Sequence, residues 1–520
     1  MFDTPTNALG ADLLWWRTRD GMRTVATLLW GRDQPFADAV HLQACLFDEQ
    51  GQPLITWRID LSPDQPVFID SAVDGPWRIA QGTDGMLALY ACTAAPPTPE
   101  ALDRYNRLFP LLEWHRANGG IATLHSDQTI RPGRERVQLF TEIVVLESDE
   151  ETNAIVLLNG ESPQMENALE LTFRNALGEE QSAFYPQAMA PFTVHRIAFA
   201  ELMSGLAKFS AGQPLVVSGR FASRGLFSRP YIETTGQRWG VYHAGDVYRW
   251  SALPYVAHAL IGGEVNPAAV LHDEHTRTYV NLLHSHGTLE ADLPIDAVLF
   301  DFDGRCVARR AAWLITRRHG LARVDVADLL PDPNLPFRGH IALSFAPARG
   351  VPVPGHLQAL MEYRRPNSVA RVMTWSDEWN SRVRLARRDR SLEPPRYRSY
   401  FRVDAGADVV TELAITNAGH NGYDRSAEVR ATYRSADGRD WHADFSLTPF
   451  ATRTATSGEL FDGSADRPPM DQPGIVLLES SSDLACIAYT HQCSTGALAA
   501  EHFLWLQSEH EGELLLPAGS

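Results

Sequence analysis

One turn pattern occurs four times along this chain, and it constrains the fold more than any other feature of the sequence. Each copy has an apolar alternating run, an aromatic residue, a polar turn ending in glycine, and a second run. The glycines lie 127, 126 and 134 residues apart, which favours a repeated domain over a short solenoid unit. The copies are Leu46-Phe47-Asp48-Glu49-Gln50-Gly51, Phe173-Arg174-Asn175-Ala176-Leu177-Gly178, Phe300-Asp301-Phe302-Asp303-Gly304 and Tyr433-Arg434-Ser435-Ala436-Asp437-Gly438.

Each copy is predicted to be a β-hairpin. Leu169, Leu171 and Phe173 alternate with polar neighbours, which is the period of a half-buried strand. The glycine supplies the positive φ that tight hairpin turns need. Further apolar runs precede and follow each hairpin at roughly matching offsets: 25–29, 154–158, 279–283 and 412–415 before it, and 86–90, 215–218, 341–345 and 475–478 after it.

These short strands predict an all-β chain of four tandem Ig-like antiparallel β-sandwich domains, because parallel α/β folds would need a helix between successive strands. At 520 residues the chain is also too long for a single core. We expect the domains to span 1–120, 121–263, 264–394 and 395–520. Short linker helices are predicted between repeats, one near 98–112 and a second over 252–261, ending at Gly262-Gly263.

The net charge is −18, with acidic residues spread through the chain. Such a surface repels phosphate backbones and anionic membranes, so we expect no nucleic-acid partner. No apolar run is long enough to span a bilayer, so no membrane insertion is expected. The start of the chain lacks the pattern of a secretory signal, which favours a cytoplasmic location and leaves the periplasm open. Five cysteines without a CxxC pair predict free thiols and no cofactor site.

The third turn differs from the other three because it carries two aspartates, Asp301 and Asp303. Leu299-Phe300-Asp301-Phe302-Asp303-Gly304 resembles the first motif of the haloacid dehalogenase phosphatases. That resemblance implies Asp301 as phosphoryl nucleophile and Asp303 as general acid. Arg305 stands where the family pattern expects threonine, and the other three turns lack the pair of aspartates. We therefore interpret this segment as a hairpin turn.

Histidines form the candidate metal site. Residues two apart on a strand point to one face, so His284 and His286 could approach a metal together. His272 or His275 would then supply the third ligand. The alternative is that all four are ordinary polar loop or strand-end residues.

Function is less constrained than fold. The preferred hypothesis is a non-enzymatic binding or structural protein that acts mainly through protein contacts. One alternative is a metal-dependent hydrolase that uses the interdomain histidines. Another is carbohydrate binding on exposed tryptophan platforms, for which the candidates are Trp15-Trp16, Trp239, Trp250, Trp375 and Trp379.

Overall fold

The fold is taken from a computed structural model of the chain. It describes residues 4–29, 39–62, 65–98, 108, 110–126, 128–246, 253–254, 268–283, 292–316, 321–345, 352–353, 357–376, 397–417, 426–462, 468, 472–480 and 484–505.

These residues form four repeated units of eight strands each. Unit 1 contains β1 (Ala8–Arg17), β2 (Arg23–Leu29), β3 (Ala39–Asp48), β4 (Pro53–Asp60), β5 (Pro66–Asp70), β6 (Asp84–Thr93), β7 (Leu111–His115) and β8 (Ile121–His125). Unit 2 contains β9 (Gln128–Val145), β10 (Glu151–Leu158), β11 (Leu169–Arg174), β12 (Glu180–Phe184), β13 (Val194–Ala198), β14 (Leu215–Ser228), β15 (Tyr231–Gly236) and β16 (Gly240–His243).

The second half of the chain repeats this plan. Unit 3 contains β19 (Ala268–His272), β20 (Arg277–Leu283), β21 (Leu293–Asp301), β22 (Cys306–Thr316), β23 (Leu321–Asp325), β24 (Phe337–Phe345), β26 (Leu357–Arg364) and β27 (Val369–Ser376). Unit 4 contains β28 (Tyr397–Val403), β29 (Val409–Thr416), β30 (Ala427–Ser435), β31 (Asp440–Leu447), β32 (Thr452–Thr456), β33 (Gly474–Ser480), β34 (Ala485–Gln492) and β35 (Ala497–His502).

Every unit has the same strand order, and its strands pair antiparallel. The outer strand orders are β1-β6-β3-β4, β9-β14-β11-β12, β19-β24-β21-β22 and β28-β33-β30-β31. Those of units 1 and 2 join into one continuous sheet, because β1 pairs with β9. The inner sheets are β5-β2-β7-β8, β13-β10-β15-β16, β23-β20-β26-β27 and β32-β29-β34-β35. The predicted all-β class of tandem antiparallel β-sandwiches is confirmed. The first strand pairs with the sixth in each outer sheet, whereas the first strand of an immunoglobulin domain lies in the sheet of the second.

The four predicted hairpin turns are confirmed with their glycine conformation. Gly51, Gly178, Gly304 and Gly438 have φ of 78°, 83°, 82° and 80°. The strands before the turns bury one face, as in β11, where Leu169, Leu171 and Phe173 are fully covered. The alternation seen in the sequence thus places one side of each hairpin in a sandwich core.

Short helical turns follow the fifth strand of each unit: η2 (Pro76–Ala80), α2 (Phe199–Leu202), η4 (Val326–Leu329) and α6 (Ser457–Leu460). Others are η1 (Arg19–Gly21) and α3 (Leu206–Ser210). Four short strands lie outside the repeated plan: β17 (Gly245–Asp246), β18 (Leu253–Pro254), β25 (Pro352–Val353) and β36 (Leu504–Trp505). In the described residues, no helix is long and apolar enough to cross a membrane.

The predicted linker helices are wrong where the structure describes them. Leu111 and Leu112 belong to β7, where each pairs with both neighbouring strands of the inner sheet. Leu253 and Pro254 form β18, which pairs with β25. Leu111 and Leu112 are both buried, so a continuous apolar run was mistaken for a helical stripe. The rest of both predicted helices, apart from Thr98, Leu108 and Pro110, lies outside the described residues.

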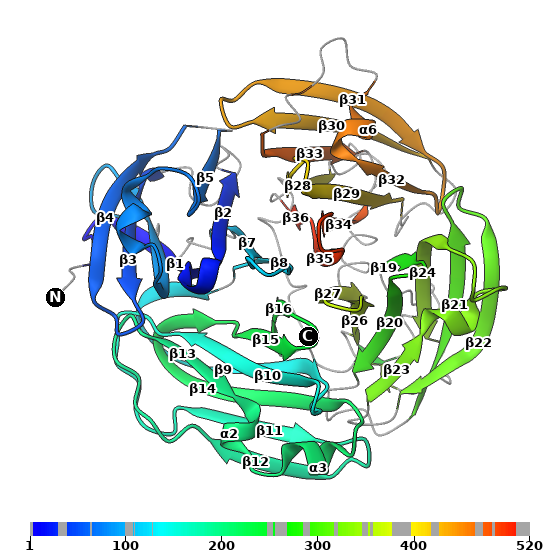
Figure 1. Cartoon of the computed structure of the whole chain (residues 1–520), viewed down its shortest axis with the longest axis horizontal. Coiled ribbons are helices and arrows are strands. Elements are labelled where there is room, and N and C mark those ends of the chain that lie inside the picture. Colours follow the sequence, from blue (N-terminus) through cyan, green and yellow to red (C-terminus); the bar gives the residue numbers. More distant parts are fainter. Residues whose placement is uncertain are drawn as a thin grey trace.

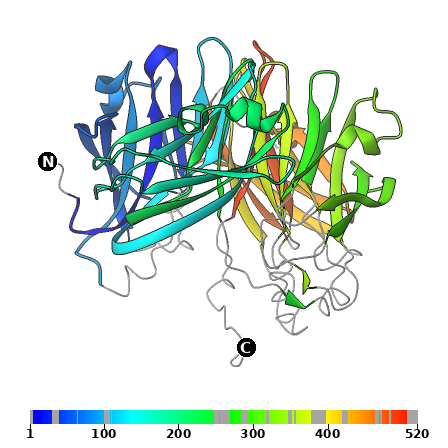
Figure 2. The ribbon, with the colours of Figure 1, turned by 90° about the horizontal axis from the view of Figure 1, so that it is seen from below.

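The four units form a closed ring around a central axis (Figure 1). Each inner sheet points its eighth strand inward, and these strands, β8, β16, β27 and β35, contact one another in turn around the axis. Seen from the side, strands run from one face of the ring toward the other (Figure 2). The expected division at residue 120 falls inside the β7–β8 hairpin, so the strand pairing extends unit 1 to at least His125.

Apolar packing also crosses the joints between units. One continuous buried cluster includes Leu13 of unit 1 and Leu171 of unit 2. The cluster of unit 3 extends to Ile487 of unit 4, and that of unit 4 includes Leu29 of unit 1. The four units therefore pack as one closed body, in which each sandwich shares buried surface with its neighbours.

Candidate functional site

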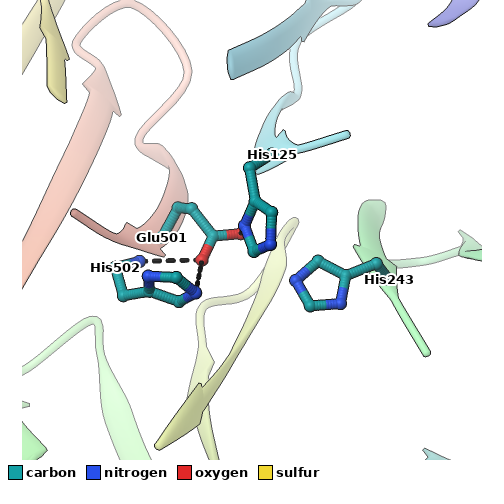
Figure 3. A group of neighbouring side chains, drawn as sticks. All are labelled: His125, His243, Glu501 and His502. Carbon is teal, nitrogen blue, oxygen red and sulfur yellow. Dashed lines mark hydrogen bonds and ion pairs between the residues drawn. The ribbon is translucent and has the colours of Figure 1, made fainter. Parts of the chain in front are cut away.

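The ring axis carries a cluster of side chains with metal-binding chemistry. Its members come from the eighth strands of three units, and they are drawn in Figure 3: His125 of β8, His243 of β16, and Glu501 and His502 of β35. One ligand atom from each lies within 4.8 Å of the others. We call these four residues the axial cluster. They meet because the ring brings together strands that are far apart in the sequence.

The three histidines occupy equivalent positions in their units. In the inner sheets, His125 pairs with Leu111, His243 with Tyr231 and His502 with Ile487. The seventh strands support the same alignment of the units. Two residues after the pairing partner, three units carry a glutamate and the fourth a tyrosine: Glu113, Glu233, Glu362 and Tyr489. The same register in unit 3 pairs Leu360 with Met373, so methionine takes the histidine position there. At this position of the eighth strand, three units thus carry an imidazole and unit 3 carries a thioether.

Local contacts orient the rings. The Nδ1 atom of His243 lies 3.1 Å from the carbonyl oxygen of Ala244, and that of His502 lies 2.9 Å from the carbonyl of Phe503. A carbonyl only accepts, so each Nδ1 carries the hydrogen and each Nε2 keeps a lone pair. The rings of His125 and His243 meet edge to face with centroids 4.4 Å apart, and those of His125 and His502 are 4.8 Å apart.

Glu501 lies between two of the rings. Its Oε1 is 3.5 Å from Nε2 of His502, and its Oε2 is 3.8 Å from Nδ1 of His125. The backbone N–H of His502 donates to Oε1 over 2.8 Å. Side-chain exposure is only 3% for Glu501 and 4% for His125, so this group is shielded from water.

Burial sets the protonation of the cluster. It raises the pKa of Glu501 and lowers the pKa of His502, because the charged form of each loses its hydration. The pKa of His243 lies well below its usual value for the same reason, with the charges of His125 and Arg229 adding to the effect. The imidazoles of His243 and His502 therefore favour the neutral form, which is the form that binds metals.

Buried ion pairs surround the axis at the joints between units. Arg17 reaches Glu233 over 2.7 Å between units 1 and 2, and Arg364 pairs with Glu151 between units 2 and 3. Between units 3 and 4, Arg338 pairs with Glu412 in a more exposed contact, in which the arginine side chain is 42% exposed.

The joint between units 4 and 1 places Arg402 3.9 Å from Glu113. The arginine and a hydrogen bond from His115 hold the pKa of Glu113 at about 2 against the effect of burial. Glu113 is therefore ionised at neutral pH and needs its cationic partner.

The predicted histidine site is placed only in part. His272 is buried at the end of β19 with Nε2 2.9 Å from the Pro333 carbonyl, and His275 is exposed beside Glu274. His284 and His286 lie outside the described residues, so a metal site built on them stays a prediction. The axial cluster was not predicted from the sequence.

The two aspartates of the third turn have a structural role. The side chain of Asp301 accepts from the backbone N–H of Asp303 over 3.0 Å and of Arg305 over 2.8 Å. Asp48 and Asn175 accept in the same way in the turns of units 1 and 2. The interpretation of this segment as a hairpin turn agrees with these contacts.

Three of the six candidate tryptophans cannot act as sugar platforms. Trp15, Trp16 and Trp239 are 2%, 1% and 2% exposed, because they are core residues. That part of the prediction is wrong, and the physical reason is the usual preference of large aromatics for burial. Trp250 and Trp379 lie outside the described residues. All five cysteines are free; Cys45, Cys92 and Cys486 are buried, whereas Cys306 and Cys493 are exposed.

Comparison with known proteins gives no relative from which function could be transferred. No family model matches the chain. No curated protein matches it. A solved structure found as similar is a tetra-tandem repeat in the extending region of a large adhesion protein, at 10% identity, covering 96% of this chain and 100% of that chain. Its TM-score is 0.09, so it supports no argument about fold or function.

Proposed function

We propose that this protein is a non-enzymatic binding or structural protein that acts through protein contacts at the outside of a rigid ring. The observation that carries the proposal is the set of buried ion pairs at the joints, such as Arg17 with Glu233 and Arg402 with Glu113. Removing one partner of a buried pair costs about 3–5 kcal/mol, so these contacts favour a fixed arrangement of the units. A fixed ring presents its outer surface in constant geometry.

The outer edge strands supply the attachment surface in this proposal. The fourth strand of each unit is the free edge of its outer sheet: β4, β12, β22 and β31. An edge strand offers unpaired backbone groups to an incoming strand. Phe184 on β12 and Ile315 on β22 are 51% and 56% exposed, which adds apolar contact area to two of these edges.

Quantitative crosslinking in cells of the native host tests the proposal. The tagged wild-type chain is compared with a Phe184→Lys/Ile315→Lys double variant, which places charges on both edges. The expected result is one reproducible crosslinked protein that is lost from the double variant. Met165→Lys is the matched control, because Met165 is 79% exposed and lies outside the strands.

Two results count against the proposal. The chain recovered alone as a monomer removes the protein-contact role. If the double variant still crosslinks to the partner, the contact does not depend on the edges at Phe184 and Ile315. The hydrolase and carbohydrate alternatives remain predictions.

A further inference from the structure

The axial cluster has no role in the proposed outer contacts, because it lies at the centre of the ring. Its donor atoms come from units 1, 2 and 4, and they converge within 4.8 Å. We propose that the axial cluster binds one Zn²⁺ ion, with three imidazole nitrogens and one carboxylate oxygen as ligands. The ion ties together the first, second and fourth units at the axis.

The separations between donor atoms fit a shared ion better than direct hydrogen bonds. Zinc–nitrogen and zinc–oxygen bonds of about 2.0–2.2 Å at tetrahedral angles place ligand atoms about 3.4 Å apart. The distances from Glu501 are 3.5 Å to His502 and 3.8 Å to His125. Hydrogen bonds between such groups are about 2.7–3.2 Å long.

The orientation of His502 points to a cation. Its Nδ1 hydrogen is directed at the Phe503 carbonyl, so the Nε2 lone pair faces the Glu501 carboxylate. Two electron-rich atoms that face one another in a buried site repel unless a proton or a metal lies between them. A metal satisfies both atoms and keeps the imidazole neutral. The carbonyl contact then acts as the outer-shell hydrogen bond that fixes the tautomer of metal-binding histidines.

Arg229 also acts on this region, and it is 2% exposed. Its positive charge stabilises the Glu501 carboxylate and disfavours protonation of His243 and His502. Arginine has no acceptor atom and cannot be a ligand. A buried acid compensated by arginine alone is therefore the competing explanation, and it predicts that no metal binds.

The composition of the site indicates its class. Borderline nitrogen donors with one carboxylate suit zinc, and four protein ligands leave no open position for water. A closed, buried site is typical of structural zinc, so no catalytic step is assigned to it. Met373, at the equivalent position of unit 3, is a soft donor that zinc does not need.

The direct experiment measures zinc in the full chain without an affinity tag. The protein is produced with zinc in the medium and passed through gel filtration with a weak chelator. Elemental analysis is expected to find one zinc per chain. Replacement by Co²⁺ is expected to give the strong visible absorption of a tetrahedral site. A chain that retains no zinc and gives no tetrahedral cobalt spectrum overturns the proposal.

Variants then locate the ion. His125→Ala, His243→Ala and Glu501→Gln should each weaken zinc binding by more than about 100-fold, because even outer-shell changes cost about 10–100-fold. His275→Ala is the matched control, since this exposed histidine pairs with Glu274 at the surface and is not part of the axial cluster. Arg229→Gln should bind zinc more tightly, because it removes a nearby positive charge.

The outcomes separate the explanations. If His275→Ala loses zinc and the axial variants keep it, the ion binds at the other histidine group. That result overturns the assignment to the axial cluster. If an axial variant does not fold, the zinc content and cobalt spectrum of the wild type still decide the matter. These readouts are independent of the outer contacts, so crosslinking can fail while zinc binding holds, and the reverse.

Discussion

The turn at Asp301–Gly304 and the axial cluster differ in how well the sequence indicates a functional site. The turn is conspicuous in the sequence, yet Asp301 hydrogen-bonds its own backbone at the surface. The axial cluster is inconspicuous in the sequence, yet it gathers four donor atoms in a buried space. The difference is that local hydrogen bonds account for the Asp301 carboxylate, whereas the cluster exists only because four units close a ring.

The largest expected effect comes from breaking a buried charge pair near the axis. Arg402→Met removes the largest stabilising charge on buried Glu113 and leaves it with His115, Arg23 and the Thr123 hydroxyl. We expect a loss of about 3–5 kcal/mol in the free energy of unfolding, measured by urea denaturation. Arg430→Met is the control, because its pair with Asp444 is exposed, and no measurable change is expected. Equal losses in the two variants would show that the ion pairs at the joints contribute no more stability than an exposed pair.

The next effect distinguishes two of the repeated turns. Gly304→Ala meets the positive-φ strain and also brings its Cβ within 2.5 Å of the Pro449 carbonyl oxygen in unit 4. Together these should cost about 3 kcal/mol in unfolding free energy. Gly438→Ala has the same strain with open space around it, so about 1–2 kcal/mol is expected. The same loss in both would mean that the third turn does not press on unit 4.

A buried carboxyl without a cation gives a pH-dependent effect. Burial raises the pKa of Glu147 to about 7, and its hydrogen bonds come from Asn153. The folded state then binds more protons than the unfolded state between about pH 4.5 and 7, so stability falls as pH rises through this window. Glu147→Gln removes this loss.

The variant should be more stable than wild type by about 2 kcal/mol at pH 8 and equally stable near pH 5. Thermal melts across this range provide the measurement. A difference that does not change with pH would assign the effect to packing instead.

The smallest effect concerns the turn itself. Asp301→Asn should change the unfolding free energy by less than about 0.5 kcal/mol, because Asn175 fills the same position in unit 2. Asp301→Ala removes the acceptor and should cost about 1 kcal/mol. Any measured binding should survive both changes. A large loss with Asn alone would return this residue to the list of functional candidates.

The sequence by itself determined the repeat, the hairpins and the all-β class, because these depend on contacts within short segments. Alternation in Leu169, Leu171 and Phe173 and the positive φ of Gly178 are local properties that the chain displays directly. Loop lengths that differ between units hid the equivalence of His125, His243 and His502. The apolar run at Leu111–Leu112 was misread because a buried strand and a buried helix share that composition.

Only the tertiary structure decided where the ends of the inner sheets lie. Closure of the ring brings β8, β16 and β35 together from the beginning, middle and end of the chain. Burial and charge at that point depend on residues hundreds of positions apart, such as Gly120 and Gln492, which share a hydrogen bond. Sequence patterning encodes which face of a strand is apolar, but it does not encode which faces meet.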